Sequence, residues 1–275
     1  MDTEAMKRLV LFNKPRGVLS AKKRDPSSPW LPTVTEVLAA AGLRSPSGIS
    51  PVGRLDAESE GLLLLTDDGK LASRMMDPQY GCRKSYLAVT RGYGRPGSRV
   101  RCSTELCTSC VAEGVQLRSN SAKPYCARPV EMAQLGYEAA ANELGGGGSL
   151  WRCLDGLVDL QQTPGASLPA AVEAAELDFV RVILTEGKKH EVRLLLRSAS
   201  LATLRLVRIA HGPLRDPQLL TRPGSWRELC AEERRLLQRG DTTEWAVAEH
   251  NTLPVVAMVY RASSPDVLAA SSSDT

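Results

Sequence analysis

The chain has 275 residues, of which 43% are hydrophobic and 24% charged, and its formal net charge at pH 7 is +4. These values describe an ordinary globular protein with enough chain for one large domain or two small ones, and they exclude a fibre or a largely disordered chain. The mild positive charge permits an anionic partner without requiring one. No apolar run approaches the length of a membrane span, so we expect no membrane partner.

The seven cysteines are an odd number, and no signal peptide precedes them. A disulfide framework is therefore disfavoured, and a reducing compartment is expected. The N-terminus lacks the composition of a transit peptide, which favours the cytoplasm, with an organelle as the alternative. Cys107 and Cys110 could form half of a zinc site. The remaining cysteines stand at unhelpful spacing, so buried, metal-free cysteines are the preferred interpretation.

The first predicted elements are a strand over residues 7–12 and a helix over residues 33–41, with Thr33 or Thr35 as the N-cap. Between them lies the basic run Lys22-Lys23-Arg24. This run could contact phosphate, or it could be a solvated group of surface charges, and the sequence does not favour one over the other.

Residues 51–69 read PVGRLDAESEGLLLLTDDG and place one carboxylate, Asp56, shortly before the apolar run Leu62–Leu65. The run is typical of a buried strand closed by a turn, and a short helix over residues 70–76 is predicted after it. Asp56 then lies on a loop held by a rigid strand, where catalytic groups are common. Taken alone, the spacing favours a simpler alternative, in which Asp56 caps a turn or is solvated on the loop.

Two later segments, residues 92–103 and 136–175, are rich in glycine, arginine, alanine or serine. Such composition buries too little apolar surface to offset the cost of ordering, so part of these segments is predicted to be mobile. We interpret residues 96–175 as a low-complexity insertion in a catalytic domain that spans residues 1–262. Residues 263–275 are predicted to be a disordered tail.

The remaining predicted elements are strands over 84–90, 177–185, 204–209 and 255–260, and helices over 188–198 and 226–238. In the helix over 188–198, Lys189, Arg193 and Arg197 are four residues apart and form a cationic stripe away from the apolar face. The stripe suits a phosphate backbone, although a solvated basic face is the simpler alternative.

The stretch GRLDAESEGLLLLTDDGKLASRMMDP, which begins at Gly53, resembles the catalytic-loop signature of the pseudouridine synthases, of the ribosomal small-subunit synthase A type and its large-subunit relatives. Further blocks resemble other signatures of the family in the expected order, and they are Lys84-Ser85-Tyr86 and residues 186–193, 206–214 and 223–229. The turn Asn13-Lys14-Pro15-Arg16-Gly17 resembles the start of the family's catalytic domain. Because fewer than ten residues precede that domain, we expect the S4-like N-terminal RNA-binding module of many relatives to be absent.

The resemblance implies an α+β fold, with a central mixed, largely antiparallel sheet, flanking helices and an RNA-binding cleft. It also implies an isomerase that converts a uridine, in ribosomal RNA, without cofactor or metal. Asp56 would be the catalytic carboxylate, Tyr86 would stack on the target uracil, and Arg193 would pair with Asp56. The further RNA contacts that we predict are Arg54, Lys84, Lys188, Lys189, Arg197 and Arg208. Leu194 departs from the arginine that many relatives have there, which weakens one RNA contact.

Absence of the N-terminal module favours large-subunit ribosomal RNA over transfer RNA, by analogy only. A monomer is expected, with ribosome-assembly particles as further candidate partners. One alternative is a non-catalytic, RNA-binding assembly factor, which the presence of Asp56, Tyr86 and Arg193 disfavours. Another is a carboxylate hydrolase that uses Glu58 or Glu60 as its second carboxyl group, which would leave the remaining blocks unexplained.

Overall fold

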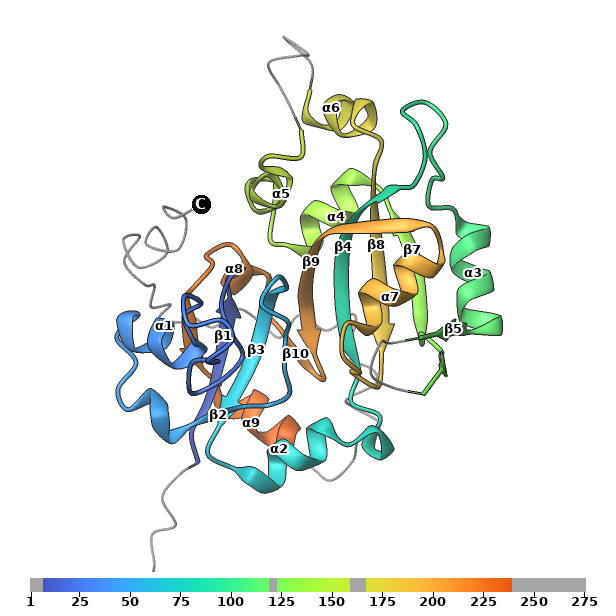
Figure 1. Cartoon of the computed structure of the whole chain (residues 1–275). Coiled ribbons are helices and arrows are strands. Elements are labelled where there is room, and N and C mark those ends of the chain that lie inside the picture. Colours follow the sequence, from blue (N-terminus) through green and yellow to red (C-terminus); the bar gives the residue numbers. More distant parts are fainter. Residues whose placement is uncertain (1–6, 119–122, 159–166, 239–275) are drawn as a thin grey trace, which may run out of the picture. The chain divides into compact units, whose positions relative to one another are not determined.

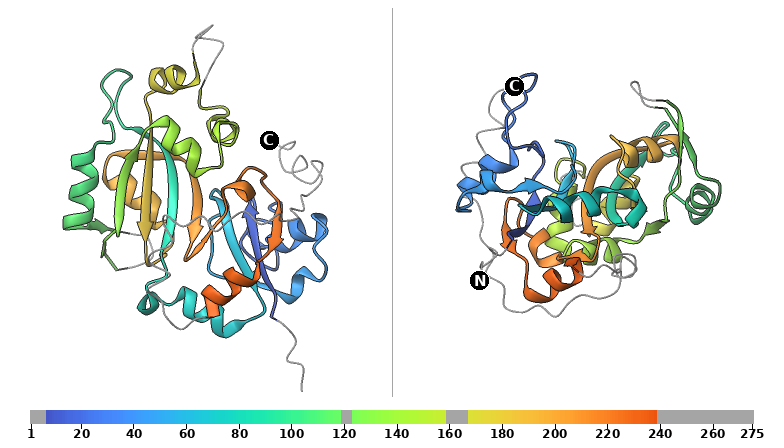
Figure 2. Two further views of the ribbon diagram at one scale, coloured as in Figure 1. Left: turned by 180° about the vertical axis from the view of Figure 1, so that it is seen from behind. Right: turned by 90° about the horizontal axis from the view of Figure 1, so that it is seen from below.

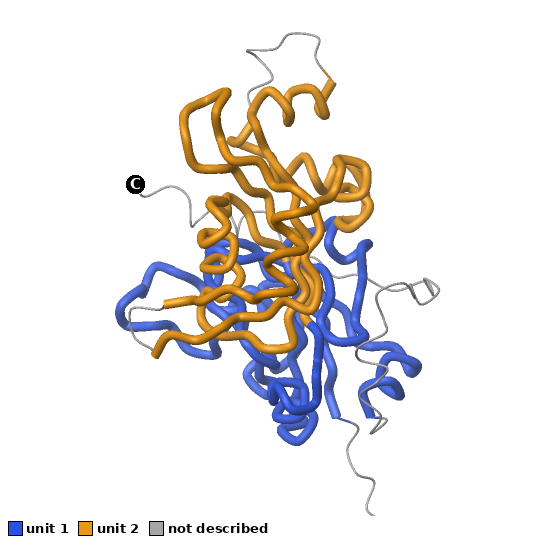
Figure 3. Tube along the Cα trace, turned by 90° about the vertical axis from the view of Figure 1, so that its right-hand side faces the viewer, with its two compact units in different colours: residues 1–83, 208–275 blue, residues 84–207 orange. Residues whose placement is uncertain are grey.

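The computed structural model describes residues 7–118, 123–158 and 167–238, so the predicted strand over 255–260 and the predicted tail lie outside the described residues. The chain divides into two compact units (Figure 3). Unit 1 comprises Met1–Arg83 and Arg208–Thr275, and unit 2 comprises Lys84–Val207. Unit 2 is thus inserted into the sequence of unit 1.

Unit 1 contains β1 (Leu9–Lys14), α1 (Val34–Ala40), a 3-10 turn (Pro46–Gly48), β2 (Ser50–Pro51), β3 (Glu60–Thr66), α2 (Gly69–Met76), a second 3-10 turn (Pro78–Tyr80), β10 (Leu214–Arg215), α8 (Pro217–Leu220), β11 (Trp226–Glu228) and α9 (Ala231–Gln238) (Figure 1). Strand β1 pairs antiparallel with both β3 and β11, and β2 pairs antiparallel with β3. The side chains of Leu9–Phe12 and Leu62–Leu65 are at most 2% exposed, so these two strands form the core of the unit.

Two helix starts in unit 1 agree with the sequence. The hydroxyl of Thr33 accepts a hydrogen bond from the backbone N of Glu36, and the Glu36 carboxylate accepts one in return from the backbone N of Thr33. This reciprocal cap fixes where α1 begins and confirms Thr33 as the N-cap. The carboxylate of Asp68 accepts from the backbone N of Leu71 and starts α2 directly after the strand.

Unit 2 contains β4 (Lys84–Gly92), α3 (Thr104–Glu113), β5 (Val115–Leu117), β6 (Tyr125–Ala127), β7 (Glu131–Leu135), α4 (Tyr137–Glu143), α5 (Gly147–Leu154), α6 (Leu168–Ala174), β8 (Leu177–Leu184) and α7 (Glu191–Ser198). Strand β8 lies between β4 and β7 and pairs antiparallel with each of them, and β5 and β6 form a separate hairpin (Figure 2). After α7, β9 (Leu201–His211) leads the chain back to unit 1.

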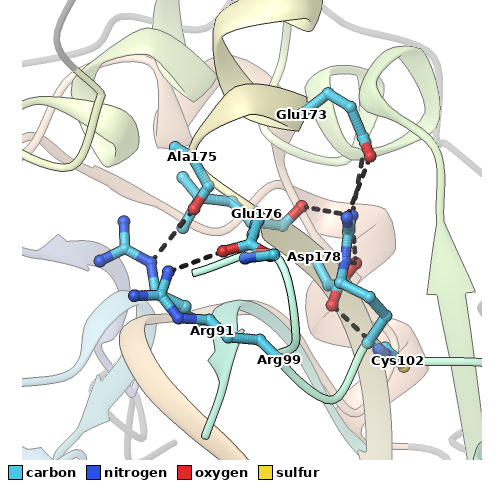
Figure 4. Close-up of polar contacts among 10 residues, drawn as sticks. Arg91, Arg99, Cys102, Glu173, Ala175, Glu176 and Asp178 are labelled. Atoms are coloured by element: carbon cyan, nitrogen blue, oxygen red, sulfur yellow. Dashed lines mark hydrogen bonds and ion pairs between the residues drawn. The ribbon is translucent and has the colours of Figure 1, made fainter. Parts of the chain in front are cut away.

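The glycine- and arginine-rich residues 92–103 are attached to the start of β8 by charged side chains (Figure 4). The guanidinium of Arg101 lies 2.9 Å from the Asp178 carboxylate and 3.0 Å from that of Glu173. Asp178, whose side chain is 1% exposed, also accepts a hydrogen bond of 2.9 Å from the backbone N of Cys102. Composition alone did not predict these contacts. The interpretation of the wider segment as an insertion stays a prediction.

Two cysteines of that region pack against each other at the start of α3. The Sγ atoms of Cys102 and Cys107 are 3.5 Å apart, and both side chains are buried. Cys102 precedes the N-cap Ser103, so the pair occupies the positions at which apolar side chains often staple a helix start. Within residues 7–118, 123–158 and 167–238, no group of three or more His, Cys, Asp or Glu side chains could hold a metal ion.

Two predicted elements differ from the structure. The helix predicted from Lys188 begins only at Glu191, because His190 adopts the left-handed conformation with φ of 58°. Lys189 therefore lies before the helix, and the predicted stripe is shortened to Arg193 and Arg197. Residues Trp226–Glu228 form β11 rather than the start of a helix, because their backbone pairs with β1. In the part of the chain that the structure describes, every helix is too short or too polar to cross a membrane.

Candidate active site

The predicted catalytic carboxylate Asp56 lies on the loop between β2 and β3 of unit 1, and its two neighbours are held by the segment that follows β1. The backbone N of Leu55 donates to the Ser20 hydroxyl at 3.0 Å, and that hydroxyl donates to the Leu55 carbonyl at 2.7 Å. On the other side, the Ala57 carbonyl accepts from the backbone N of Gly17 at 2.9 Å. The backbone of this half-buried aspartate is thus fixed on both sides, which suits a preorganised catalytic group.

Lys14, at the end of β1, is the buried cation beneath this loop. Its side chain is fully buried, and Nζ donates to the carbonyls of Pro15, Val18 and Ala57 at 2.9, 2.8 and 3.3 Å. Burial lowers the pKa of Lys14 to about 7, against the opposing effect of the carboxylates of Glu60, Asp56 and Glu58. Lys14 belongs to the turn Asn13–Gly17 that resembles the start of the family's catalytic domain, and no role was predicted for it. A lysine at the buried end of a predicted strand was the available signal.

The second residue of β3, Gly61, is a glycine because another backbone lies against it. Gly61 has φ of +101°, and a Cβ atom at this position would meet the carbonyl oxygen of Arg208 at 2.3 Å. The Arg208 side chain is 1% exposed, and its Nε donates to the Leu62 carbonyl at 2.7 Å. The guanidinium of Arg208 is thus buried against β3 and has a structural role in unit 1, while its predicted RNA contact stays a prediction.

In unit 2, Tyr86 lies on β4, opposite Val182 of β8, and is 7% exposed. Lys84 lies two residues earlier on the same strand and is also 7% exposed. Its Nζ donates to the carbonyl of Thr185, at the end of β8, at 3.1 Å. Lys84 therefore holds the end of β8, and the direct RNA contact that the sequence predicted for it stays a prediction.

Arg193 lies on the first turns of α7 and is half-buried, and its Nη1 donates to the Thr203 carbonyl at 3.4 Å. The preceding Glu191 is 3% exposed and accepts from the backbone N of Lys188 at 2.9 Å. Burial, together with the negative charge of Glu186, raises the pKa of Glu191 to about 7. Glu191 thus orders the turn that leads into the helix of Arg193, and sequence reasoning had not singled it out.

The turn before α7 also contains a cation stacked on an aromatic ring. Nζ of Lys188 lies 3.7 Å from the ring centroid of Tyr125 and 2.7 Å from the Glu186 carboxylate. The predicted RNA contacts Lys188 and Lys189 are exposed here, as is Arg197 on α7, and Arg54 is exposed on the Asp56 loop. These four cations have the accessibility that a phosphate contact needs.

The predicted catalytic residues belong to different units, with Asp56 in unit 1 and Tyr86 and Arg193 in unit 2. Within unit 2, one turn joins β8, which pairs with the strand of Tyr86, to the helix of Arg193. The pairing of Asp56 with Arg193 stays a prediction. Chemically, the residues comprise a fixed carboxylate, a buried phenol and a partly buried guanidinium. The exposed cation Arg54 lies on the Asp56 loop, and the other three lie on α7 or directly before it.

Comparisons with known proteins agree on one family. A family model described as RNA pseudouridylate synthase matches residues 8–198. The chain is 36% identical, over 219 residues, to the ribosomal large subunit pseudouridine synthase E of Xanthomonas campestris pv. campestris, which covers 80% of this chain and 94% of that protein. An uncharacterized RNA pseudouridine synthase of Aquifex aeolicus is 30% identical and covers 81% of this chain and 66% of its own.

Among solved structures, a crystal structure of pseudouridylate synthase superposes with a TM-score of 0.57 at 20% identity, over 84% of this chain and 74% of that one. The fold is therefore the mixed α+β fold of these proteins, with a central, mostly antiparallel sheet and flanking helices, which confirms the predicted fold class.

Proposed function

The chain belongs to the RNA pseudouridine synthases, which are isomerases, and from this premise we propose that it converts one uridine of large-subunit ribosomal RNA to pseudouridine. Support for the substrate comes from the relatives, since two with 36% and 33% identity are named ribosomal large subunit pseudouridine synthase E. The chain matches 94% and 87% of their lengths, so the resemblance extends over nearly all of each relative.

In the proposed reaction, the bond between ribose C1′ and uracil N1 breaks, the base turns, and C1′ is joined to C5 of the same base. The C5 proton leaves to solvent and N1 takes up a proton, so atoms balance without cofactor or oxidant. The step needs a carboxylate beside C1′, as nucleophile or as electrostatic partner of the positively charged sugar, and we assign this role to Asp56. The observation that carries the assignment is the backbone anchoring of Leu55 and Ala57, which fixes Asp56 before substrate arrives.

Tyr86 and Arg193 complete the proposed site. A phenol offers a flat apolar face for stacking on the uracil and a polar tip for proton transfer, and the low exposure of Tyr86 fits a dry pocket. Arg193 would stabilise the ionised form of Asp56. A base inside a helix is out of reach, so the target uridine is expected to flip out of its stack.

Arg54, Lys188, Lys189 and Arg197 are the proposed phosphate contacts around this site, because their side chains are exposed. We place the activity in the cytoplasm, since all seven cysteines are free thiols, as a reducing compartment maintains them. A monomer is proposed.

Release of tritium from RNA labelled at uracil C5 tests the proposal, because only the isomerisation displaces the C5 hydrogen. Purified protein is incubated with labelled transcripts of large-subunit and small-subunit ribosomal RNA. We expect one equivalent of tritium from the large-subunit transcript and none with Asp56→Asn. Equal release from both transcripts would contradict the substrate assignment. Binding without release from either would instead support an assembly factor.

A further inference from the structure

A second basic feature of unit 1 lies apart from the Asp56 loop. Helices α2 and α9 lie side by side at one end of the unit (Figures 1 and 2) and line a cavity of about 1160 Å³. We call it the α2–α9 cavity, and its charged lining residues are the cations Lys7, Lys70, Arg74, Arg234 and Arg235 and the carboxylates Asp68 and Asp77. Five positive and two negative side chains give the lining a net charge of +3.

Both carboxylates of the cavity are already engaged in local structure. Asp68 accepts from the backbone N of Leu71 at the start of α2. Asp77 accepts from the backbone N and the side-chain amide of Gln79, at 3.0 and 2.8 Å. Both carboxylates keep their negative charge. Among residues 7–118, 123–158 and 167–238, neither forms an ion pair with a lining cation, so an anionic ligand would have no such ion pair to break.

Two of the cations fasten the walls of the cavity together. The guanidinium of Arg74, on α2, donates to the Leu237 carbonyl on α9. Arg234 donates to the carbonyls of Lys7 and Leu229, at 2.7 and 3.1 Å. These contacts hold both helices and the start of β1 in place, so the cavity is a built feature of the unit.

The other three cations, Lys7, Lys70 and Arg235, have exposed side chains. Their side chains make no hydrogen bond or ion pair within the described ranges of the chain. Three exposed cations around a concave, partly walled surface raise its positive potential and attract anions. A polyanion is the chemistry that fits, because one small anion would neutralise only part of the charge.

The position of the cavity relative to Asp56 follows from β3. Asp56 precedes the strand, whereas Asp68, Gly69 and Lys70 follow it, so the strand of seven residues separates the two features. At the rise of an extended strand, its ends are about 20 Å apart. An RNA that delivers a uridine to Asp56 must therefore extend well beyond the flipped nucleotide to reach the cavity.

We propose that the α2–α9 cavity binds the phosphate backbone of the substrate RNA at a site remote from the modified uridine, through Lys7, Lys70 and Arg235. The inference rests on the proposed function, since it assumes an RNA substrate, and it adds an interaction surface to it. The cavity binds by charge and carries no base specificity. It contributes to affinity for long substrates and not to the chemical step.

Charge reversal at the cavity tests the proposal. The double variant Lys70→Glu/Arg235→Glu is compared with Arg44→Glu/Arg222→Glu, which reverses two exposed cations of the same unit outside the cavity. Binding and tritium release are measured for a long ribosomal RNA fragment and for a short stem-loop that contains the target uridine. For the long fragment, we expect the cavity variant to raise Kd about tenfold or more, and to lower the slope of log K against log salt by about 1.5.

For the short stem-loop, the cavity variant should match wild type in both Kd and kcat, because such a substrate is too short to reach the cavity. The control pair should change the long-fragment Kd far less. Equal losses on long and short RNA, or a cavity variant that equals the control, would overturn the inference while wild-type turnover still supports the proposed function. Absence of turnover in wild type would instead refute the proposed function.

Discussion

In each unit, a buried ionisable side chain lies next to its part of the proposed site, and these two side chains, Lys14 and Glu191, have opposite charge. In unit 1, Lys14 lies fully buried beneath the Asp56 loop, with its pKa lowered to about 7. In unit 2, Glu191 is 3% exposed at the start of the Arg193 helix, with its pKa raised to about 7. Both hold loops through backbone groups, and in both burial favours the neutral form. A loop fixed in this way needs a polar side chain in the interior. Because burial shifts the pKa of that side chain, the free energy of unfolding becomes dependent on pH.

Neither Lys14 nor Glu191 has a proposed role in catalysis. The largest expected loss of activity is at Asp56. Asp56→Asn keeps the size of the side chain and the loop contacts of Leu55 and Ala57, but it removes the charge. We expect tritium release to fall by about a thousandfold or more, with unchanged thermal unfolding. Glu58→Gln is the matched control, because Glu58 is an exposed carboxylate on the same loop, and it should retain most activity. Equal losses in the two variants would move catalysis away from Asp56.

The second largest expected effect is on stability, at a buried arginine of unit 1 that is paired with two carboxylates. Arg227 is 3% exposed and lies 2.5 Å from Asp216 and 2.7 Å from Glu233, which joins β11 to α9 and to the start of α8. Arg227→Met leaves two buried carboxylates without their cation and should lower the free energy of unfolding by about 3–5 kcal/mol. Chemical denaturation measures this. The exposed Arg222→Met should stay within about 0.5 kcal/mol of wild type.

The lowered pKa of Lys14 in unit 1 predicts that the free energy of unfolding rises with pH. The pKa of Lys14 is lower in the folded than in the unfolded protein, so between about pH 7 and pH 10.5 the unfolded state binds more protons. The unfolding free energy should therefore rise across this window, by an amount on the order of a few kcal/mol. Denaturation of wild type and Lys14→Met at several pH values checks this. A rise of the same size in both proteins would contradict the assignment to Lys14.

The raised pKa of Glu191 in unit 2 predicts the opposite trend in a lower pH range, where its contribution to the free energy of unfolding falls as pH rises. The pKa of Glu191 is raised above its ordinary value of 4.5, so its stabilising contribution is complete below pH 4.5 and is lost as pH rises to about 7. Glu191→Gln should remove this loss, so the variant gains stability relative to wild type as pH rises from 4.5 to 7. Amide hydrogen exchange of α7 at the two ends of the window provides the local measurement.

The smallest expected effects concern the exposed cations. Arg54→Gln and Arg197→Gln should each raise the Kd for RNA about threefold to tenfold, with little change in stability. Lys84→Gln and Arg208→Gln should instead destabilise the fold, because their side chains hold the carbonyls of Thr185 and Leu62. Filter binding together with thermal melts separates the two groups. A stable Arg208 variant with weakened RNA binding would instead support the predicted RNA contact of Arg208.

Much of the fold could be predicted from periodicity, because β3 reads as an unbroken apolar run and Thr33 precedes a helical pattern. The family blocks selected Asp56, Tyr86 and Arg193 by resemblance, which no spacing argument could have done. The burial of Arg208 and Lys84 was missed, since a cation that binds a distant carbonyl looks in sequence like one that binds phosphate. The start of α7 was missed because the left-handed backbone of His190 has no sequence signature comparable to glycine.

The most direct test of the central claim compares pseudouridine maps of ribosomal RNA from cells with and without this protein. Wild-type protein, Asp56→Asn and Glu58→Gln are each supplied to the deficient cells. The account predicts that one uridine of large-subunit ribosomal RNA loses its modification, and that wild type and Glu58→Gln restore it while Asp56→Asn does not. An unchanged map, or full restoration by Asp56→Asn, would contradict the claim that this chain is a synthase acting through Asp56.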